Sequence, residues 1–217
     1  VAVISNPDVS IEELIEIVKG PDFPTGAFIH GMAGIRQAYR TGRGLIRVRA
    51  RTRVEKLKGE RENIIVSLGA KHSIYNVAQA FFDKGDEIII PAPYWVSYPD
   101  IALLAGATPV IVDTSQKNGF KMTAAQLDKA ITPKTKCVIL NSPSNPTGSA
   151  YTKDELGKLA KVIVKRDVTV LSDEIYEKLV YAGFEFASIA SLGEEVKKRT
   201  SVVNGLSKAF STTGWRI

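Results

Sequence analysis

The feature that most constrains the fold is a regular alternation of apolar runs and amphipathic segments after Val66. The apolar runs are residues 87–90, 109–112, 137–140, 168–171 and 201–203, each short enough for one strand. Helices are expected between them, over residues 69–82, 97–104, 123–130, 153–164 and 194–198. Strands that alternate with helices predict an α/β fold with a mostly parallel sheet flanked by helices on both faces.

Polar and ionisable residues follow several of these apolar runs. Asn145 comes after the run 137–140, Asp173 and Tyr176 come after the run 168–171, and Lys208 comes after the run 201–203. In sheets of this kind ligands bind beyond the carboxyl ends of the strands. These four side chains are therefore expected to share one site.

Residues 1–62 follow a different pattern. A helix is expected over residues 10–19, where apolar residues recur at helical spacing and Ser10 with Glu13 makes a capping box. Residues 45–54 alternate apolar side chains with arginines, which indicates a half-exposed strand, and a hairpin through residues 58–60 would return along 63–66. The sequence thus predicts a small α+β segment, 1–62, ahead of an α/β part, 63–217.

The net charge of +6 is concentrated in part of that first segment. Ten lysines and arginines stand between Arg36 and Arg61, and only Glu55 and Glu60 oppose them. Such a cluster is either a face that contacts phosphates or a solvated strand surface, and both interpretations stay open. No run approaches the roughly 18 apolar residues of a membrane span. With Cys137 as the single cysteine and no signal-peptide pattern, a cytoplasmic chain without membrane association is expected.

Five motifs occur in order in the second part of the chain. They are Leu-Gly-Ala-Lys at 68–71, Pro-Ala-Pro-Tyr-Trp at 91–95, Asn-Ser-Pro-Ser-Asn-Pro-Thr-Gly at 141–148, Ser-Asp-Glu-Ile-Tyr at 172–176, and the segment 204–216 around Lys208. From about residue 62 to 217 the chain resembles the class I/II aminotransferases, the aspartate aminotransferase-like branch of fold type I. The resemblance implies a partial cofactor-binding large domain that uses pyridoxal 5′-phosphate. It also implies transfer of an amino group from an amino acid to a 2-oxo acid, of the aspartate or aromatic type.

The resemblance implies a chemical role for each motif residue. Lys208 would hold the cofactor aldehyde as a Schiff base and then carry a proton. Asp173 would keep the pyridine nitrogen protonated, and Tyr176 and Asn145 would reach the phenolic oxygen of the cofactor. Trp95 would stack on the ring. Taken alone, Asp173 could instead be a helix N-cap, Asn145 a turn residue and Trp95 a buried aromatic.

The phosphate group of the cofactor would need fixed donors and positive charge. Gly69, Ala70 and Lys71 open a helix, so their backbone amides would face the anion. The resemblance also assigns the hydroxyl of Ser207 and the guanidinium of Arg216 to the phosphate. Lys208, Asp173 and Tyr176 form the expected catalytic set, and no metal ligand is predicted.

Residues 1 to about 66 resemble another family, the A subunit of bacterial type II topoisomerases (gyrase and topoisomerase IV). The likeness is carried by residues 11–14, 20–26 and 34–44, which include the run Ala-Tyr-Arg-Thr-Gly-Arg-Gly, and by the arginine strand 46–54. The motif with the DNA-cleaving tyrosine of that family is not in the chain, and Tyr39 does not match it. The two resemblances predict a chimera, with weak DNA contact possible through residues 36–61.

The aminotransferase likeness stops at Ile217, whereas relatives continue with a small domain and the arginine that grips the substrate carboxylate. We therefore expect a cofactor domain that is catalytically incomplete as given, and a homodimer if it folds. The alternatives are a DNA-binding topoisomerase fragment or a non-functional fusion.

Overall fold

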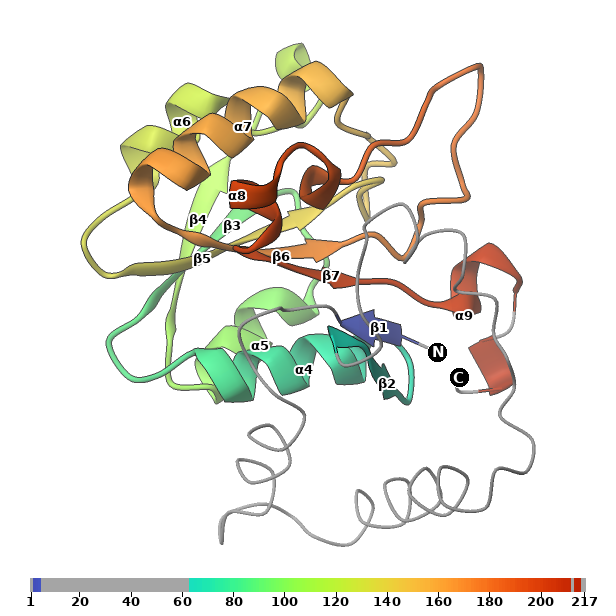
Figure 1. Cartoon of the computed structure of the whole chain (residues 1–217), viewed down its shortest axis with the longest axis horizontal. Helices are drawn as coiled ribbons and strands as arrows, with labels where there is room; N and C mark the ends of the chain where they lie inside the picture. Colours follow the sequence, from blue (N-terminus) through green and yellow to red (C-terminus); the bar gives the residue numbers. More distant parts are fainter. Residues whose placement is uncertain (1, 5–62, 212, 216–217) are drawn as a thin grey trace, which may run out of the picture.

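The computed structural model describes residues 2–4, 63–211 and 213–215 of the chain. Most of these residues form a five-stranded sheet with helices on both faces (Figure 1). The helix expected at 10–19, the arginine strand at 45–54 and the hairpin at 58–60 lie outside the described residues.

The strands of the sheet follow the predicted apolar runs. They are β3 (Glu87–Ala92), β4 (Thr108–Asp113), β5 (Thr135–Asn141), β6 (Thr169–Asp173) and β7 (Thr200–Val203). Their order across the sheet is β4-β3-β5-β6-β7, and every neighbouring pair is parallel. The prediction of an α/β fold with a mostly parallel sheet is therefore confirmed.

The helices also fall where the periodicity placed them. They are α4 (Ala70–Phe81), α5 (Ser97–Leu104), α6 (Ala124–Ala130), α7 (Lys153–Arg166) and α8 (Glu194–Lys197). Capping boxes begin α6 at Thr123 and α7 at Thr152, because each threonine hydroxyl accepts a first-turn amide. A four-residue helix that the sequence reasoning missed, α9 (Leu206–Ala209), carries Lys208.

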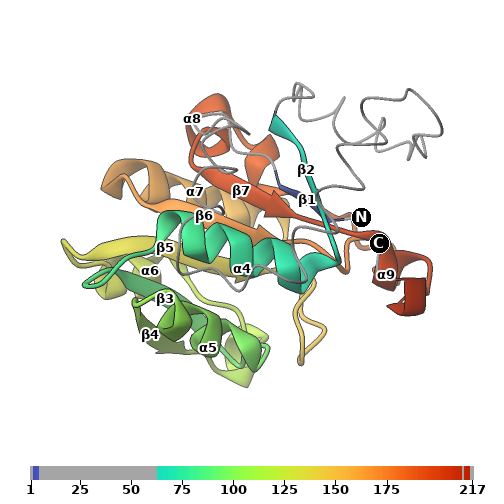
Figure 2. The same ribbon diagram turned by 90° about the horizontal axis from the view of Figure 1, so that it is seen from below.

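Two hydrophobic layers hold the helices against the sheet. Helices α4 and α5 lie on one face, and α6, α7 and α8 lie on the other (Figures 1 and 2). Strand β3 contributes to both layers, since Ile88 and Ile90 belong to the cluster with α4 and α5 while Ile89 belongs to the cluster with α6 and α7. Burial on both faces explains why the strand runs are continuously apolar.

The strand order creates a crevice at the carboxyl ends of β3 and β5. Strand β4 lies on one side of β3 and β5 on the other, so the chain reverses its direction of travel across the sheet at this point. Ligands of open α/β sheets bind at such a reversal. A pocket lies there, lined by residues that include Ile90, Tyr98, Lys121, Asn141 and Tyr151.

A second, two-stranded ladder lies beside α4 and the edge strand β7 (Figures 1 and 2). It pairs β1 (Ala2–Ile4) with β2 (Ile65–Ser67) in antiparallel fashion, with Val3 opposite Val66. The strand expected at 63–66 is therefore present as β2. Its described partner is β1, and the hairpin partner expected at 45–54 lies outside the described residues.

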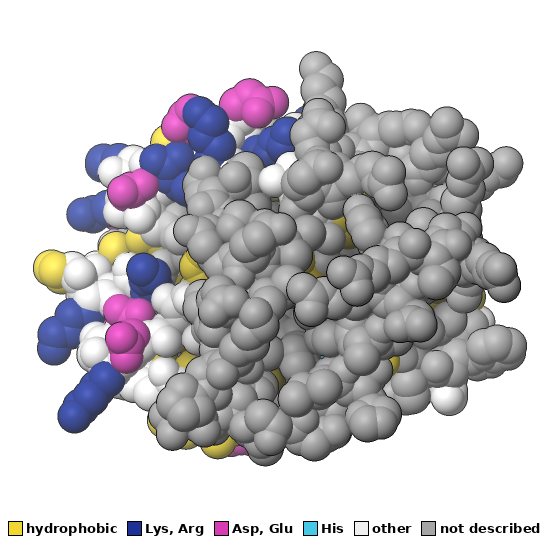
Figure 3. Space-filling view, turned by 60° about the horizontal axis from the view of Figure 1, so that its bottom comes forward, with side chains coloured by type: hydrophobic (Ala, Val, Ile, Leu, Met, Phe, Trp, Pro, Cys, Tyr) yellow, Lys and Arg dark blue, Asp and Glu magenta, His cyan; other side chains and the backbone are white. Residues whose placement is uncertain are grey.

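Some large apolar side chains remain on the surface. Val96, Leu103 and Leu104, at the two ends of α5, are 74%, 59% and 69% exposed. On the coloured part of the face shown in Figure 3, hydrophobic side chains lie among lysine, arginine and acidic side chains. None of the helices in the described part of the chain has the length and apolar character needed to cross a membrane.

Candidate functional site

Asp173 is the centre of the polar residues at the carboxyl end of the sheet. It is the last residue of β6 and only 4% exposed. Its Oδ2 accepts a hydrogen bond from the Tyr98 hydroxyl at 2.7 Å, and its Oδ1 accepts one from the Ile175 amide at 3.1 Å. Among the described residues no lysine, arginine or histidine forms an ion pair with it. Burial raises the pKa of Asp173, and the two hydrogen bonds oppose part of that rise.

Tyr98 reaches Asp173 from α5 on the neighbouring layer. The side chain is 2% exposed, and burial together with the charge of Asp173 raises its pKa well above the ordinary value. The phenol therefore keeps its proton and acts as the donor. The Tyr98 ring also meets the ring of Trp95 edge to face, with centroids 5.3 Å apart.

Trp95 connects this pair to the start of α4. The Nζ atom of Lys71 lies 4.8 Å from the centroid of the Trp95 ring, a distance at which an ammonium is attracted to an indole. Lys71 belongs to the first turn of α4, whose N-cap Gly69 has φ 83° and ψ 163° and makes no side-chain cap bond. The first-turn amides, which include those of Ala70 and Lys71, have no intrahelical acceptor and can bind an anion.

Asn141 links the loop after β5 to the end of β6. Its Nδ2 donates to the backbone oxygen of Asp173 at 3.0 Å, and its Oδ1 accepts from the amide of Asn145 at 2.7 Å. The amide of Ser142 also donates to the Asp173 oxygen, at 3.2 Å. The backbone positions of Asp173 and Asn145 are thus fixed by one side chain.

Tyr176 and Lys208 form a second pair near this network. Lys208 is exposed on α9, and its Nζ lies 6.0 Å from the centroid of the half-buried Tyr176 ring. Ser207, next to Lys208, is 8% exposed, and its backbone oxygen accepts from the Thr213 hydroxyl at 3.4 Å. Arg216 lies outside the described residues.

Glu174 is a second buried carboxylate, adjacent in sequence to Asp173. It is 1% exposed, and its Oε1 accepts from the hydroxyls of Ser172 at 2.9 Å and Ser188 at 2.6 Å. Its backbone amide donates to the oxygen of Val203 on β7. These bonds anchor the turn after β6 and so help to fix the orientation of Asp173.

The structure joins several of the predicted site residues by direct contacts. Lys71, Trp95, Asp173 and Asn145 belong to one continuous chain of interactions, in which Tyr98 and Asn141 are the links. The pocket at the carboxyl ends of β3 and β5 shares Tyr98 and Asn141 with this chain, whereas Asp173 and Lys208 do not line it. Asp173 is not a helix N-cap, since the amide it accepts is that of Ile175, two residues on, and no α-helix begins there.

Sequence reasoning missed Tyr98, Asn141 and Glu174. Asn141 and Glu174 lie within motifs that were singled out, and Tyr98 comes three residues after Trp95. Their polar character at the start of a helix or the end of an apolar run was the available signal. Their partners come from other elements, which the spacing of residues does not reveal.

Comparisons with known proteins show which family and which solved structures the chain resembles. Residues 18–217 match the family described as aminotransferase class I and II. An aspartate aminotransferase of Bacillus sp. (strain YM-2) is 51% identical over 170 residues, and one of Geobacillus stearothermophilus is 54% identical over 158 residues. These alignments cover 76% and 73% of this chain but 43% and 40% of the relatives.

Solved structures give the same fold. The crystal structure of the aspartate aminotransferase from Rhizobium meliloti matches with a TM-score of 0.75 and 35% identity, covering 96% of this chain and 59% of that one. The Thermus thermophilus aspartate aminotransferase with maleate matches with a TM-score of 0.74 and 36% identity, covering 98% and 53%. The chain thus spans between two fifths and three fifths of the length of these relatives.

Proposed function

Because the chain belongs to the class I and II aminotransferase family, we propose that residues 63–217 are the cofactor-binding part of an aspartate-type aminotransferase that uses pyridoxal 5′-phosphate. The observation that carries the proposal is Asp173. A carboxylate that is 4% exposed and has no described cation partner is costly to keep in a fold. A protonated pyridine nitrogen is the cationic partner that would compensate it.

The residues around Asp173 fit the other parts of the cofactor. When bound, pyridoxal 5′-phosphate supplies an aldehyde and a ring that accepts electrons. Lys208 supplies the amine that we assign to hold that aldehyde and, once released, to accept and return a proton. Trp95 offers an aromatic face, and Tyr176 and Asn145 offer polar groups for the phenolic oxygen.

The start of α4 fits a phosphate group. Its amides at Ala70 and Lys71 point along the helix dipole, and Gly69 has no side chain to obstruct an anion. The hydroxyl of Ser207 and the guanidinium of Arg216 complete the set that we assign to the phosphate. The proposed catalytic residues remain Lys208, Asp173 and Tyr176.

The substrates that we propose are an amino acid and a 2-oxo acid, which exchange an amino group. The chain covers 43% and 40% of the two bacterial relatives, so the groups that bind substrate in them can lie in the part that this chain does not span. We also propose that the protein is cytoplasmic. We further propose that it forms a homodimer, since the exposed leucines at α5 are apolar surface that a second copy can bury.

The origin of residues 1–62 is a separate question. We infer a boundary near residue 62 from the change of sequence pattern there. The alignments with the two curated relatives cover 76% and 73% of the chain, a share similar to that of residues 63–217. The family match itself begins earlier, at residue 18. A topoisomerase-like segment fused to the aminotransferase domain therefore stays a hypothesis, as does weak DNA contact through the arginines of 36–61. The sequence of the gene across codons 60–70 and its neighbours would test the fusion.

An absorbance titration tests the proposed function. Pyridoxal 5′-phosphate added to the purified chain is expected to produce a visible band that Lys208→Ala abolishes. Lys161→Ala is the matched control, since Lys161 is exposed on the outer side of α7 and is expected to leave the band unchanged. No band in a folded wild-type chain, or an equal band in Lys208→Ala, would contradict the proposal. Salt-sensitive retention on DNA without any band would favour the nucleic-acid hypothesis.

A further inference from the structure

We propose that Tyr98 is a positioning residue that keeps the Asp173 carboxylate in the ionised form which a protonated cofactor nitrogen requires. This inference rests on the proposed function and assigns a role to a residue outside the five sequence motifs. The contact that carries it joins the Tyr98 hydroxyl to Asp173 Oδ2 at 2.7 Å, between side chains that are 2% and 4% exposed.

The environment of Asp173 makes this hydrogen bond important. Burial favours the neutral carboxyl group and raises its pKa, which works against the charge that the cofactor needs. Within the described residues the opposing interactions are the bonds from Tyr98 and from the Ile175 amide. Only the bond from Tyr98 comes from a side chain and from the other layer of the fold, so it is the one that a substitution can remove.

The pair also determines which group donates the hydrogen bond, the Tyr98 hydroxyl or the Asp173 carboxyl group. Burial and the negative charge of Asp173 both raise the pKa of Tyr98, so the phenol holds its proton over the whole physiological range. A phenol that cannot lose its proton can only donate to the carboxylate. Tyr98 therefore stabilises the ionised carboxylate without competing for the proton of the cofactor.

Packing holds Tyr98 in place for this role. Its ring lies in the cluster formed by α4, α5 and one face of the sheet, and it meets Trp95 edge to face. Phenylalanine would keep these contacts and lose only the hydroxyl. The substitution Tyr98→Phe thus isolates the hydrogen bond from the packing.

Other groups around Asp173 titrate or carry charge, and the test has to separate them. On the described elements near it they are Tyr176 and Glu174 in the turn after β6, Lys71 and His72 at the start of α4, and Lys208 on α9. His72 has a lowered pKa because it is partly buried, so it too changes charge at moderately acidic pH. All of these groups are present in both Tyr98→Phe and a control variant, so their contributions cancel in the comparison.

Thr200→Val is the matched control. Thr200 is 2% exposed, and its hydroxyl donates to the backbone oxygen of Val196 at 2.7 Å, so this variant also loses one buried, hydrogen-bonded hydroxyl. Thr200 begins β7, at the end of the sheet opposite Asp173, and the described hydrogen bonds of the Asp173 carboxylate do not involve it. A merely structural effect should therefore appear in both variants.

The first measurement uses no cofactor. The chain is labelled with ¹³C at the aspartate carboxyl carbons, the Asp173 signal is assigned by its absence in Asp173→Asn, and it is followed by NMR as pH is changed. Removing the Tyr98 hydroxyl should move the Asp173 titration to higher pH, while Thr200→Val leaves it unchanged. An unchanged titration in Tyr98→Phe would overturn the inference.

The second measurement uses pyridoxal 5′-phosphate binding, followed by absorbance at several pH values. Affinity should fall as pH drops through the pKa of Asp173 in the free protein, because the protonated carboxyl cannot pair with the ring nitrogen. In Tyr98→Phe this decline should begin at higher pH, and affinity at neutral pH should fall about tenfold, the effect of one hydrogen bond to a charged group. An equal loss at every pH would mean a structural role and would overturn the inference. Wild-type chain that shows the carboxyl titration but binds no cofactor would instead overturn the proposed function and leave the effect of Tyr98 on Asp173 to the NMR result.

Discussion

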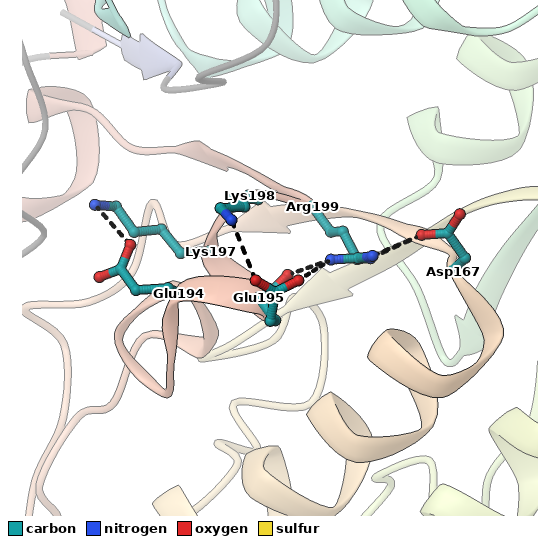
Figure 4. A network of polar contacts seen from close by, with 6 residues as sticks. All are labelled: Asp167, Glu194, Glu195, Lys197, Lys198 and Arg199. Carbon is teal, nitrogen blue, oxygen red and sulfur yellow. Dashed lines mark hydrogen bonds and ion pairs between the residues drawn. The ribbon is translucent and has the colours of Figure 1, made fainter.

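Two aspartates at opposite ends of the same strand differ in solvent exposure and in the charge of their partners. Asp167 stands just before β6, with 82% of its side chain exposed, and its Oδ1 lies 2.8 Å from Arg199 Nη2. Arg199 in turn pairs with Glu195, which also pairs with Lys198, in the network that Figure 4 shows. Asp173 ends the strand at 4% exposure, and among the described residues its carboxylate accepts hydrogen bonds from an uncharged phenol and a backbone amide only.

The difference indicates which end of the sheet is suited to bind a charged ligand. Ion pairs in water are easily formed and add little stability, and salt screens them. A buried carboxylate with neutral partners costs stability until a cation arrives. At the end of β6 that carries Asp173, a cationic ligand can therefore offset the loss of stability caused by the buried carboxylate.

The largest expected effect concerns the strand that both aspartates share. Leu171 is 1% exposed in the layer formed with α4 and α5. Leu171→Ala should lower the free energy of unfolding by about 2–5 kcal/mol, because it removes buried methyl groups and leaves a cavity. Urea denaturation followed by circular dichroism measures this change. Lys161→Ala, at an exposed side chain of α7, is the control and should stay within about 0.5 kcal/mol of wild type.

A smaller effect is expected at the binding end of the sheet. Gly69 has φ 83° and ψ 163°, a conformation that is nearly exclusive to glycine. Gly69→Ala should cost about 1–3 kcal/mol and should also weaken cofactor binding, since the start of α4 would shift. Gly157→Ala is the matched control within α7, where an added Cβ meets nothing within 4 Å. It should stabilise the chain by about 0.5–1 kcal/mol in the same denaturation assay.

The pH dependence of stability distinguishes the two aspartates further. The pKa of Asp173 is raised in the folded chain, so the unfolded chain loses this proton first as pH increases. Stability should therefore fall as pH rises from the ordinary carboxyl pKa through the raised value. Asp173→Asn should remove this part of the pH dependence and leave the chain without cofactor at least as stable at neutral pH. A thermal melting series from pH 3 to 8 on both proteins, roughly spanning the carboxyl range, measures it. Identical slopes in the two proteins would contradict the assignment of a raised pKa to Asp173.

The smallest effect is expected at the exposed end of β6. Asp167→Asn removes the charge partner of Arg199 and keeps a residue that tolerates the left-handed backbone, φ 56°, at this position. Stability should fall by less than about 1 kcal/mol, and high salt should reduce the difference. Denaturation at low and high salt checks this. A loss as large as that of Leu171→Ala would mean that the exposed network, not the buried layer, fixes the strand.

Much of the fold followed from the sequence because the strands and helices are marked locally. The apolar run 168–171 predicted β6, and Asp173 was expected at its end, where the structure has it. Helix α5 was expected at 97–104 and spans those residues. The pairing of β1 with β2 was not foreseen, because its two strands lie far apart in the sequence and no short-range pattern marks them as partners.

The candidate site was predictable to a lesser degree. The order of apolar runs already grouped Lys208 with Asp173 at the carboxyl ends of the strands, whereas Trp95 was identified only by a family motif. The contact between Tyr98 and Asp173 spans 75 positions and joins α5 to the end of β6. Such a contact depends on which strands and helices lie next to each other, so it could be found only once the strand order was known.

The most direct test of the central claim locates the covalent bond to the cofactor. The chain is incubated with pyridoxal 5′-phosphate, reduced with borohydride, digested and analysed by mass spectrometry. The account predicts one dominant labelled peptide, modified at Lys208, and its loss in Asp173→Asn under conditions of limiting cofactor. Labelling spread over the exposed lysines in proportion to their accessibility, with no preference for Lys208 in folded protein, would contradict it.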